Sequence, residues 1–239
     1  MSQEEAIKKK ANPPRINNTL LGPAESRFIH WFVGIAPDWV SPDQMTIIGM
    51  IGSILILVGY ALTPRSSAFL WLASFGFFLN WFGDSLDGNI ARIRHIERPR
   101  YGYFVDHSLD TIGMLFIFVG LGLTPHINML IALSALISYL LMGIYVYINT
   151  QVNKEFQISY AKLGPTEGRL IFVIGNIVMY FVGIQSISLL NIQFSIYDIY
   201  FMAWTIFLLI LFFGNVFKGI IKLYREEPPI KYTSPDKHS

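Results

Sequence analysis

The sequence predicts an all-α membrane protein, in which six transmembrane helices follow an N-terminal interfacial amphipathic helix. Of the 239 residues, 53% are hydrophobic and 14% are charged, whereas a soluble domain carries about 25% charged residues. The apolar residues form six runs that are long enough to cross a bilayer. Almost all Lys and Arg residues fall in segments that would lie on one side of that bilayer.

The two ends of the chain are expected to lie outside the membrane core. Residues 1–40 divide into a polar tail, up to about residue 20, and an interfacial helix at residues 25–35. This helix mixes aromatic residues with Arg27 and His30, and it is too short and too polar to span a bilayer. No apolar core follows the N-terminal lysines, so we expect no cleavable signal peptide. Residues 226–239 form a second polar tail.

The six expected spans lie within residues 41–225 and are separated by short breaks. Ser41 and Pro42 resemble a helix start before the first span, and Pro64 and Pro125 mark breaks after the first and third spans. The expected spans cover residues 43–62, 67–95, 103–123, 127–152, 166–187 and 196–224. Asparagines within these apolar runs are expected to form hydrogen bonds between helices: Asn80, Asn176 and Asn215.

The distribution of positive charge predicts the orientation of these spans. With this topology, one face of the membrane carries every one of the 18 Lys and Arg residues except Arg65. Cytoplasmic loops are enriched in Lys and Arg, so both termini and the junction of the second and third spans should face the cytoplasm. Cysteine is absent from the sequence, which excludes disulfides and thiolate metal sites.

Four aspartates lie at the junction of the second and third spans. Asp84 and Asp87 are three residues apart, and Asp106 and Asp110 are four apart, so each pair shares one face of a helix. Carboxylates in a transmembrane segment are costly and functional by default. Two such faces turned toward each other would form an oxygen-only cage for hard divalent cations such as Mg²⁺ or Mn²⁺.

Small and basic residues beside the aspartates suit a diphosphate ligand. Gly88 and Ala91 would let a large ligand approach one helix closely, and Gly102 could give the same clearance on the facing helix. Arg92 offers a planar fork of donors for phosphate oxygens. Two cations can neutralise phosphate charge, and a carboxylate that the cations do not fully occupy can take the proton from an alcohol.

The order and spacing of eight residues in this stretch resemble the signature of the CDP-alcohol phosphotransferases: Asp84-x2-Asp87-Gly88-x2-Ala91-Arg92 … Gly102-x3-Asp106-x3-Asp110. The six-helix plan and the interfacial N-terminal helix are similar to this family as well. One more residue than the family usually has separates Arg92 from Gly102. This residue falls in a charged turn, where insertions are tolerated most easily.

The resemblance implies a metal-dependent transfer in a cavity that opens to the cytoplasm. A CDP-linked donor would meet an alcohol acceptor there, and CMP would leave. Two ions, Mg²⁺ or Mn²⁺, would be bound by Asp84, Asp87 and Asp106, with Asp110 also near them as the favoured general base. The residues expected to bind CDP are Thr46, Asp84, Gly88, Ala91, Arg92 and Gly102. The resemblance also implies a homodimer among membrane lipids, without a nucleic-acid partner.

Three further residues have two interpretations each. His107 follows Asp106, and by position alone it would be solvated or near lipid headgroups. Residues 104–107 nevertheless resemble the Phe-Asp-His element of the eukaryotic choline and ethanolamine phosphotransferases, which makes His107 a candidate catalytic base. Glu167 could cap the fifth span, or it could face the acceptor end of the cavity together with Arg169.

Two substrate arrangements fit this chemistry. In one, CDP-ethanolamine or CDP-choline donates to diacylglycerol; in the other, CDP-diacylglycerol donates to inositol phosphate, glycerol phosphate or serine. A phosphorylated acceptor needs a cationic pocket, and the scarcity of Lys and Arg inside spans three to six slightly favours the first. The rival classes are a cation transporter, which predicts acidic groups near the midplane, and a structural scaffold, which gives the carboxylates no purpose.

Overall fold

The computed structural model describes residues 21–153, 164–189 and 192–229, and these residues form seven helices and one antiparallel hairpin. In chain order the elements are α2 (Gly22–Ile35), α3 (Pro42–Leu62), α4 (Phe69–Ile93), α5 (Pro99–Leu123), α6 (Met129–Asn153), α7 (Pro165–Val182), β1 (Ser186–Leu189), β2 (Ile192–Ser195) and α8 (Ile196–Glu226). The expected outer parts of both tails lie outside the described residues.

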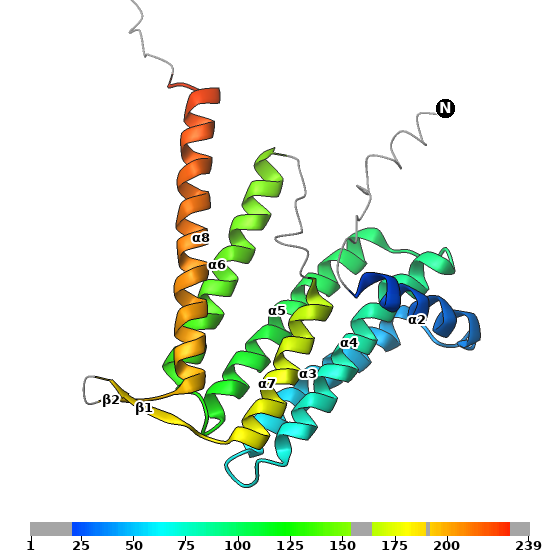
Figure 1. Cartoon of the computed structure of the whole chain (residues 1–239). Helices are drawn as coiled ribbons and strands as arrows, with labels where there is room; N and C mark the ends of the chain where they lie inside the picture. The colour runs from blue at the N-terminus through cyan, green and yellow to red at the C-terminus, as the bar shows by residue number, and fades with distance from the viewer. Residues whose placement is uncertain (1–20, 154–163, 190–191, 230–239) are drawn as a thin grey trace, which may run out of the picture.

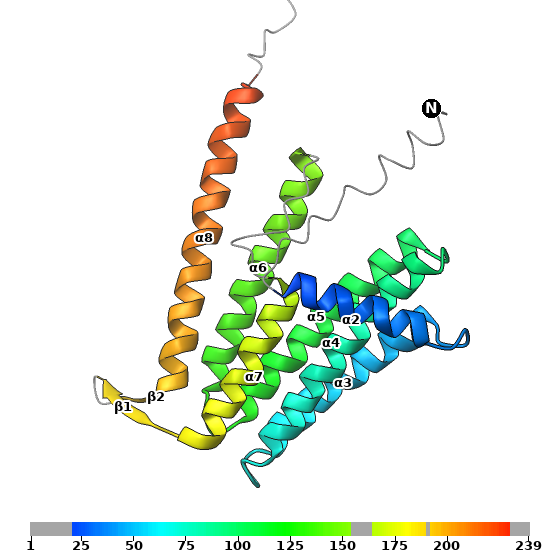
Figure 2. The same ribbon diagram turned by 45° about the vertical axis from the view of Figure 1, so that its right-hand side comes forward.

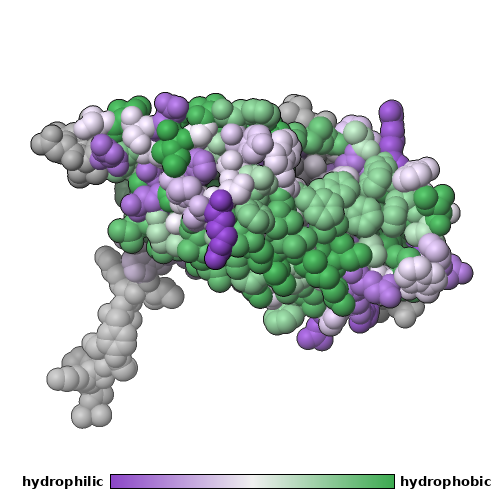
Figure 3. Space-filling view, turned by 90° about the horizontal axis from the view of Figure 1, so that it is seen from below, coloured by the Kyte–Doolittle hydropathy of each residue, from purple (hydrophilic) through white to green (hydrophobic). Residues whose placement is uncertain are grey.

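Four of the described helices are long and apolar enough to cross a membrane: α3, α5, α6 and α8. Large apolar side chains are exposed along them, such as Leu130 (75%) on α6 and Phe217 (66%) on α8. In the view from below, hydrophobic residues form a broad area and most hydrophilic residues lie near its margins (Figure 3). These findings confirm an integral membrane protein that is almost entirely helical. The six-span count, which would add α4 and α7, stays a prediction.

The start of α3 follows directly from its sequence. The Ser41 hydroxyl accepts a hydrogen bond from the Gln44 backbone N–H at 3.3 Å, and the Ser41 N–H donates to Gln44 Oε1 at 2.8 Å. This reciprocal cap satisfies two backbone N–H donors at the helix end. Pro42 occupies the first turn, where its missing N–H costs nothing. The expected helix start at Ser41–Pro42 is therefore confirmed.

Small residues bring α3 and α4 into backbone contact. A Cβ added at Gly52 would lie 2.7 Å from the carbonyl oxygen of Gly76 and would collide with the backbone N of Asn80. Asn80 also donates to Ser53 Oγ at 3.0 Å and to the carbonyl of Gly49 at 3.2 Å. Such small-residue contacts with side-chain hydrogen bonds are typical of helix pairs in membranes. The interhelical role expected of Asn80 is confirmed.

A second expected asparagine also bridges helices. Asn176 on α7 accepts a hydrogen bond from the hydroxyl of Tyr60 on α3 at 2.8 Å, and it donates to Ser74 Oγ on α4 at 3.1 Å. Tyr60 and Asn176 are almost inaccessible, and Ser74 is half-buried. Because the amide satisfies both partners, α7 is fixed in register against α3 and α4.

The helices divide into two groups in space. In Figures 1 and 2, α3, α4, α5 and α7 form one bundle, while α6 and α8 run beside each other as a separate pair. The pair is joined to the bundle through α5 and α6 and through the hairpin. Helix α2 crosses the end of the bundle at which α4 finishes and α5 and α7 begin (Figure 2). This end carries the expected site.

The prediction that the fifth span continues to Ile187 is wrong. Helix α7 stops at Val182, Gly183 takes a positive φ of 68°, and Ile187 lies in β1 instead of in a helix. The positive φ suits glycine and ends the helix. The following residues alternate polar and apolar with a period of two, which favours a strand over a helix. Helix α8 then begins at Ile196, as expected.

Candidate functional site

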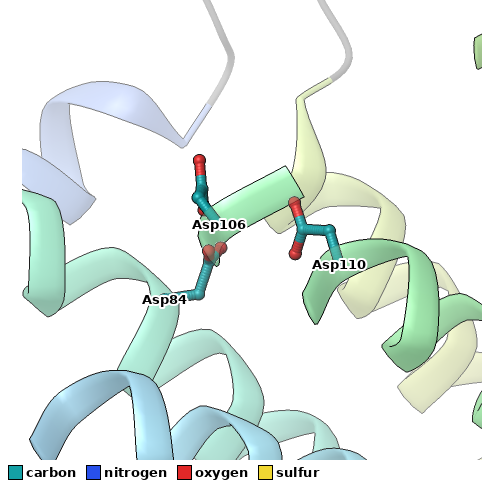
Figure 4. Close-up of side chains that lie close together, drawn as sticks. All are labelled: Asp84, Asp106 and Asp110. Carbon is teal, nitrogen blue, oxygen red and sulfur yellow. The ribbon is translucent and has the colours of Figure 1, made fainter. Parts of the chain in front are cut away.

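Three of the four predicted aspartates meet at the end of the bundle. Asp84 on α4 and Asp106 and Asp110 on α5 each offer a carboxylate oxygen, and these oxygens lie within 4.8 Å of one another. Their side chains project into one gap between α4 and α5 (Figure 4). The residues lining this pocket are Thr46, Gly49, Met50, Ser53, Asn80, Asp84, Asp87, Asp106, Leu109 and Asp110. The expectation that the two acidic helix faces turn toward each other is met by this geometry.

The donor set of this cluster fits a hard divalent cation. All three groups are carboxylates, and they are partly accessible, with side-chain exposures of 25% for Asp84, 34% for Asp106 and 53% for Asp110. Mg²⁺ and Mn²⁺ prefer such oxygen ligands and keep room for water or substrate phosphates. Like charges this close repel one another unless a cation lies between them.

Asp87 lines the same pocket but has protein partners for both oxygens. Its Oδ2 accepts a hydrogen bond from Thr46 Oγ1 at 2.8 Å, and its Oδ1 accepts one from the backbone N–H of Gly88 at 2.5 Å. The Thr46 hydroxyl, predicted from the sequence to contact cytidine, is therefore directed at a carboxylate. Because Thr46 belongs to α3, its bond fixes the Asp87 rotamer across the α3–α4 contact.

An arginine from α7 completes the cluster. Arg169 Nη2 donates to Asp84 Oδ2 at 2.7 Å and lies 4.0 Å from Asp110 Oδ1, while its Nε donates to Asn80 Oδ1 at 2.7 Å. Its side chain is only 14% exposed. The sequence predicted Arg169 at the acceptor end of the cavity, and the structure places it on the carboxylates. Asn80 precedes Asp84 by four residues, so one-turn spacing could have identified it as a site residue.

Of the residues expected to bind CDP, Thr46 and Asp84 line the pocket, whereas Gly88, Ala91, Arg92 and Gly102 are not among its lining residues. The Arg92 guanidinium folds over Gly88, with Nη1 only 3.2 Å from the place where a Cβ would lie, and its Nη2 donates to Asn89 Oδ1 at 3.0 Å. Gly102 on α5 has nothing within 4 Å of such a Cβ. Ala91 is half-buried on the same helix. A side chain at Gly88 would therefore require the Arg92 guanidinium to shift slightly, and Gly102 leaves open space on the facing helix.

His107 lies beside the cluster and stacks on an aromatic neighbour. Its Nδ1 is 3.0 Å from the carbonyl oxygen of Tyr103 and 3.6 Å from Asp106 Oδ2. Its ring centre is 4.1 Å from that of Tyr103 and 5.8 Å from that of Tyr147 on α6. A proton on Nδ1 would be held by the backbone carbonyl, which leaves Nε2 as the nitrogen able to exchange a proton with a substrate.

Two glutamates tie α2 to the site, and the sequence identified only one of them. Glu167 is buried and accepts hydrogen bonds from the backbone N–H groups of Gly164 and Leu21, at 2.9 and 3.0 Å. This geometry favours the capping interpretation of Glu167. Glu25 on α2 accepts hydrogen bonds from side chains of both α4 and α7. An acidic residue in a short aromatic-rich helix was the signal that could have identified Glu25.

This arrangement defines a class of protein: a helical membrane protein whose clustered carboxylates and arginine face a pocket at one end of a bundle. The chain belongs to the CDP-alcohol phosphatidyltransferase family, because the model of that family matches residues 39–214. This match covers more than half of the chain and includes α3 to α7 together with most of α8. The family inferred from the eight-residue signature is confirmed.

Individual relatives bear names of two kinds. Cholinephosphotransferase 1 of Homo sapiens is 24% identical over 171 residues, covering 69% of this chain and 42% of the relative. The Xenopus laevis protein of the same name is 31% identical over 108 residues, covering 43% and 27%. Phosphatidylinositol phosphate synthase of Cutibacterium acnes is 41% identical over 84 residues, covering 35% and 38%. The chain spans less than half the length of each of these relatives.

Proposed function

We propose that this chain transfers a phospho-alcohol group from a CDP-linked donor to an alcohol acceptor, with release of CMP, in phospholipid biosynthesis. The observation that carries this proposal is the convergence of Asp84, Asp106 and Asp110 within 4.8 Å in a member of this family. Arg169 donates to Asp84 of that cluster, and Arg92, two turns after Asp84 on α4, offers a guanidinium that suits anionic phosphates. Turnover depends on divalent cations, Mg²⁺ or Mn²⁺.

The cations would be held by the carboxylates of the cluster, with Asp87 next to them in the same pocket. When bound, two such ions neutralise the diphosphate and stabilise the attacking and leaving oxygens. The protein supplies the geometry: Thr46 holds Asp87, while Asn80 holds Arg169, which in turn holds Asp84. Fixed ligands of this kind keep an anionic substrate in one orientation.

The transfer step follows from the positions of the remaining groups. The acceptor oxygen bonds to the phosphorus that carries the donor's alcohol, and the bond from this phosphorus to the oxygen of CMP breaks. Asp110 takes the proton of the acceptor hydroxyl, since it is the most exposed carboxylate of the cluster. His107 lies on the same helix, three residues earlier, as a second candidate base. Arg92, Ala91 and Gly88 bind the CDP moiety, and Gly102 keeps its path open.

Of the two substrate arrangements, we favour a CDP-linked amino alcohol as the donor and diacylglycerol as the acceptor. A relative that matches 69% of this chain is named as a cholinephosphotransferase. Arg169, the cation in contact with the cluster, is already paired with Asp84 and hydrogen-bonded to Asn80, so a phosphorylated acceptor would meet a charge that a carboxylate partly neutralises. The second candidate, CDP-diacylglycerol with a small polar alcohol, is favoured by the higher identity to the phosphatidylinositol phosphate synthase.

The position of the chain in the membrane is part of the same proposal. Six spans, with α4 and α7 added to the four most apolar helices, would bring the cluster, both termini and α2 to the cytoplasmic surface. Helix α2 would lie in the headgroup region, where its exposed Trp31 and Trp39 just beyond it suit the interface. Exposed apolar side chains on α6 and α8 would contact lipids or a second copy in a homodimer.

The test is an assay of the purified chain in lipid vesicles with a panel of CDP-linked donors and acceptors, with and without Mg²⁺ or Mn²⁺. We expect cation-dependent CMP release together with a lipid product whose mass identifies the donor and acceptor. A product from CDP-choline or CDP-ethanolamine and diacylglycerol supports the first arrangement, and one from CDP-diacylglycerol supports the second. Cation flux across the vesicles without CMP release would favour a transporter and overturn the proposal.

A further inference from the structure

Glu25 connects three helices through a single carboxylate. Its Oε1 accepts hydrogen bonds from Ser85 Oγ at 2.5 Å and Trp81 Nε1 at 3.2 Å, both on α4, and its Oε2 accepts one from Thr166 Oγ1 on α7 at 3.1 Å. Three donors to one partly buried carboxylate are a strong restraint, because charge-assisted hydrogen bonds are stronger than neutral ones. Helix α2 is therefore fixed across the junction of α4 and α7.

The restraint is reciprocal. Glu167 on α7 accepts hydrogen bonds from the N–H of Leu21, which precedes α2, and from the N–H of Gly164, which precedes α7. Each of the two helices thus begins with a carboxylate that binds the beginning of the other. Because the two links run in opposite directions, the start of α7 has little freedom to move away from α2 and α4.

The next turn of α7 reaches the acidic cluster. Arg169 follows Thr166 by three residues, so the two side chains lie on the same face of the helix. Its guanidinium donates to Asp84 and Asn80, both at 2.7 Å. Asp84 in turn is adjacent to Ser85, which donates to Glu25. The link at Glu25 and the ion pair at Asp84 therefore both join α4 to α7. On α7 their residues, Thr166 and Arg169, lie one turn apart.

We propose that Glu25 is a positioning residue: by fixing α7 on α4 it holds Arg169 against Asp84 and so sets the affinity of the carboxylate cluster for divalent cations. This inference rests on the proposed function, because it assumes that the cluster binds cations. The physical reason is competition. A guanidinium that donates to a ligand oxygen lowers the negative potential that a cation experiences, and this effect is large where water is partly excluded.

Whether cation binding becomes tighter or weaker distinguishes this role of Glu25 from two simpler ones. If α7 loosens, Arg169 moves off Asp84 and the cluster binds a cation more tightly. A loss of the negative charge of Glu25 alone would weaken cation binding, as would general damage to the fold. Only release of the arginine strengthens it. The experiment therefore needs variants that separate the hydrogen bonds of Glu25 from its charge.

The probe is Mn²⁺ alone, without nucleotide, with the free ion measured by its paramagnetic resonance signal in the presence of the purified full chain. Glu25→Ala removes the link, and Thr166→Val removes one hydrogen bond without a change of charge or shape. Glu25→Gln removes the charge while keeping an acceptor for Ser85 and Trp81 and a donor for Thr166. Arg169→Met removes the competing cation.

We expect Arg169→Met to tighten Mn²⁺ binding on the order of tenfold, and Glu25→Ala and Thr166→Val by about threefold each. Glu25→Gln should bind as the wild type does or slightly more weakly. Adding Glu25→Ala to Arg169→Met should produce no further tightening. Phe32→Leu is the control for loosened packing, because Phe32 packs edge-on against Phe82 on α4 and, in the contacts given for the described residues, touches neither α7 nor the donors to Glu25; it should lower thermal stability and leave Mn²⁺ binding unchanged.

Unchanged or weaker Mn²⁺ binding in Glu25→Ala, with tighter binding in Arg169→Met, would overturn the role of Glu25 and leave the proposed function intact. Equal tightening by Glu25→Ala with and without Arg169 would show that Glu25 does not act through the arginine. If the wild type binds no Mn²⁺ even with a CDP-linked donor, the metal site of the proposed function fails, and this inference fails with it.

Discussion

The α3–α4 pair and the α6–α8 pair are both built from apolar helices, yet they pack by different means. Between α3 and α4, glycines such as Gly52 and Gly83 bring the two backbones into contact, with no room for a Cβ. On α8, a Cβ at Gly214 would meet nothing within 4 Å, and Phe213 and Phe217 are 63% and 66% exposed. Small residues therefore determine the contact between α3 and α4. On α8, by contrast, large apolar side chains face outward.

The polar contacts follow the same division. Four hydrogen bonds or ion pairs of 3.0 Å or less cross between helices of the bundle near the site: Thr46–Asp87, Asn80–Ser53, Arg169–Asp84 and Arg169–Asn80. Between α6 and α8, the described residues show a 3.5 Å contact of Lys222 Nζ with Asn153 Oδ1, and at the ends where both helices begin, the N–H of Asn128 donates to Asp198 at 2.7 Å. The comparison teaches that precise placement of the aspartates depends on the bundle, whereas α6 and α8 can tolerate looser packing.

The largest expected effect is a loss of activity when a carboxylate of the bundle is replaced. The matched control replaces a carboxylate of α8. Asp87→Asn should lower kcat/KM on the order of 10³-fold, or about 4 kcal/mol of barrier, because ligand charge is lost while the shape is kept. Asp198→Asn is the matched control on α8, where the carboxylate caps the helix and bonds the N–H of Asn128. It should affect thermal stability and leave the cation dependence of turnover intact. Near-full activity of Asp87→Asn would remove Asp87 from the metal site.

The second-largest expected effect concerns the general base that takes the proton of the acceptor hydroxyl. Asp110→Asn should lower kcat on the order of 10²-fold or more with a small change in donor KM, because a general base acts in the transition state. His107→Gln, on the same helix, should cost less than tenfold if Asp110 takes the proton. Steady-state kinetics with the donor identified by the panel assay distinguish the two. Equal losses of kcat and donor affinity in Asp110→Asn would make Asp110 a ligand only.

Much of the helical fold and of the aspartate site could be predicted from the sequence. Apolar run length and the Ser41–Pro42 start predicted the helices, and the three- and four-residue spacings predicted which aspartates share a face. These features are local, so a single sequence contains them. The family signature, which was equally local, was confirmed by the family match.

The rest depends on contacts between distant segments. That Thr46 would bond Asp87, 41 residues later, or that Arg169 would bond Asp84, 85 residues earlier, requires the packing of whole helices. The same holds for Glu25, whose partners lie on α4 and α7. The hairpin was missed for another reason, because apolar residues with a period of two were read as the end of a helix.

The third effect tests the packing itself. Gly52→Val should destabilise the protein by about 3 kcal/mol, because the new side chain must displace the backbone of Gly76 and Asn80. Activity should fall as well, since Asn80 holds Arg169. Gly214→Val on α8 is the matched control and should leave thermal stability in detergent nearly unchanged, because the space around it is open. Similar melting temperatures for the two variants would contradict the difference between the two pairs.

The smallest expected effect tests whether the bundle positions side chains through single hydroxyls. Thr46→Val removes the 2.8 Å bond to Asp87 while keeping the shape, so we expect kcat to fall about tenfold, which corresponds to about 1.4 kcal/mol. Thr205→Val is the control, because the Thr205 hydroxyl bonds only to the carbonyl of Phe201 in its own helix, as far as the described contacts show. A fall in donor affinity without a change in kcat would instead make Thr46 the cytidine contact that the sequence predicted.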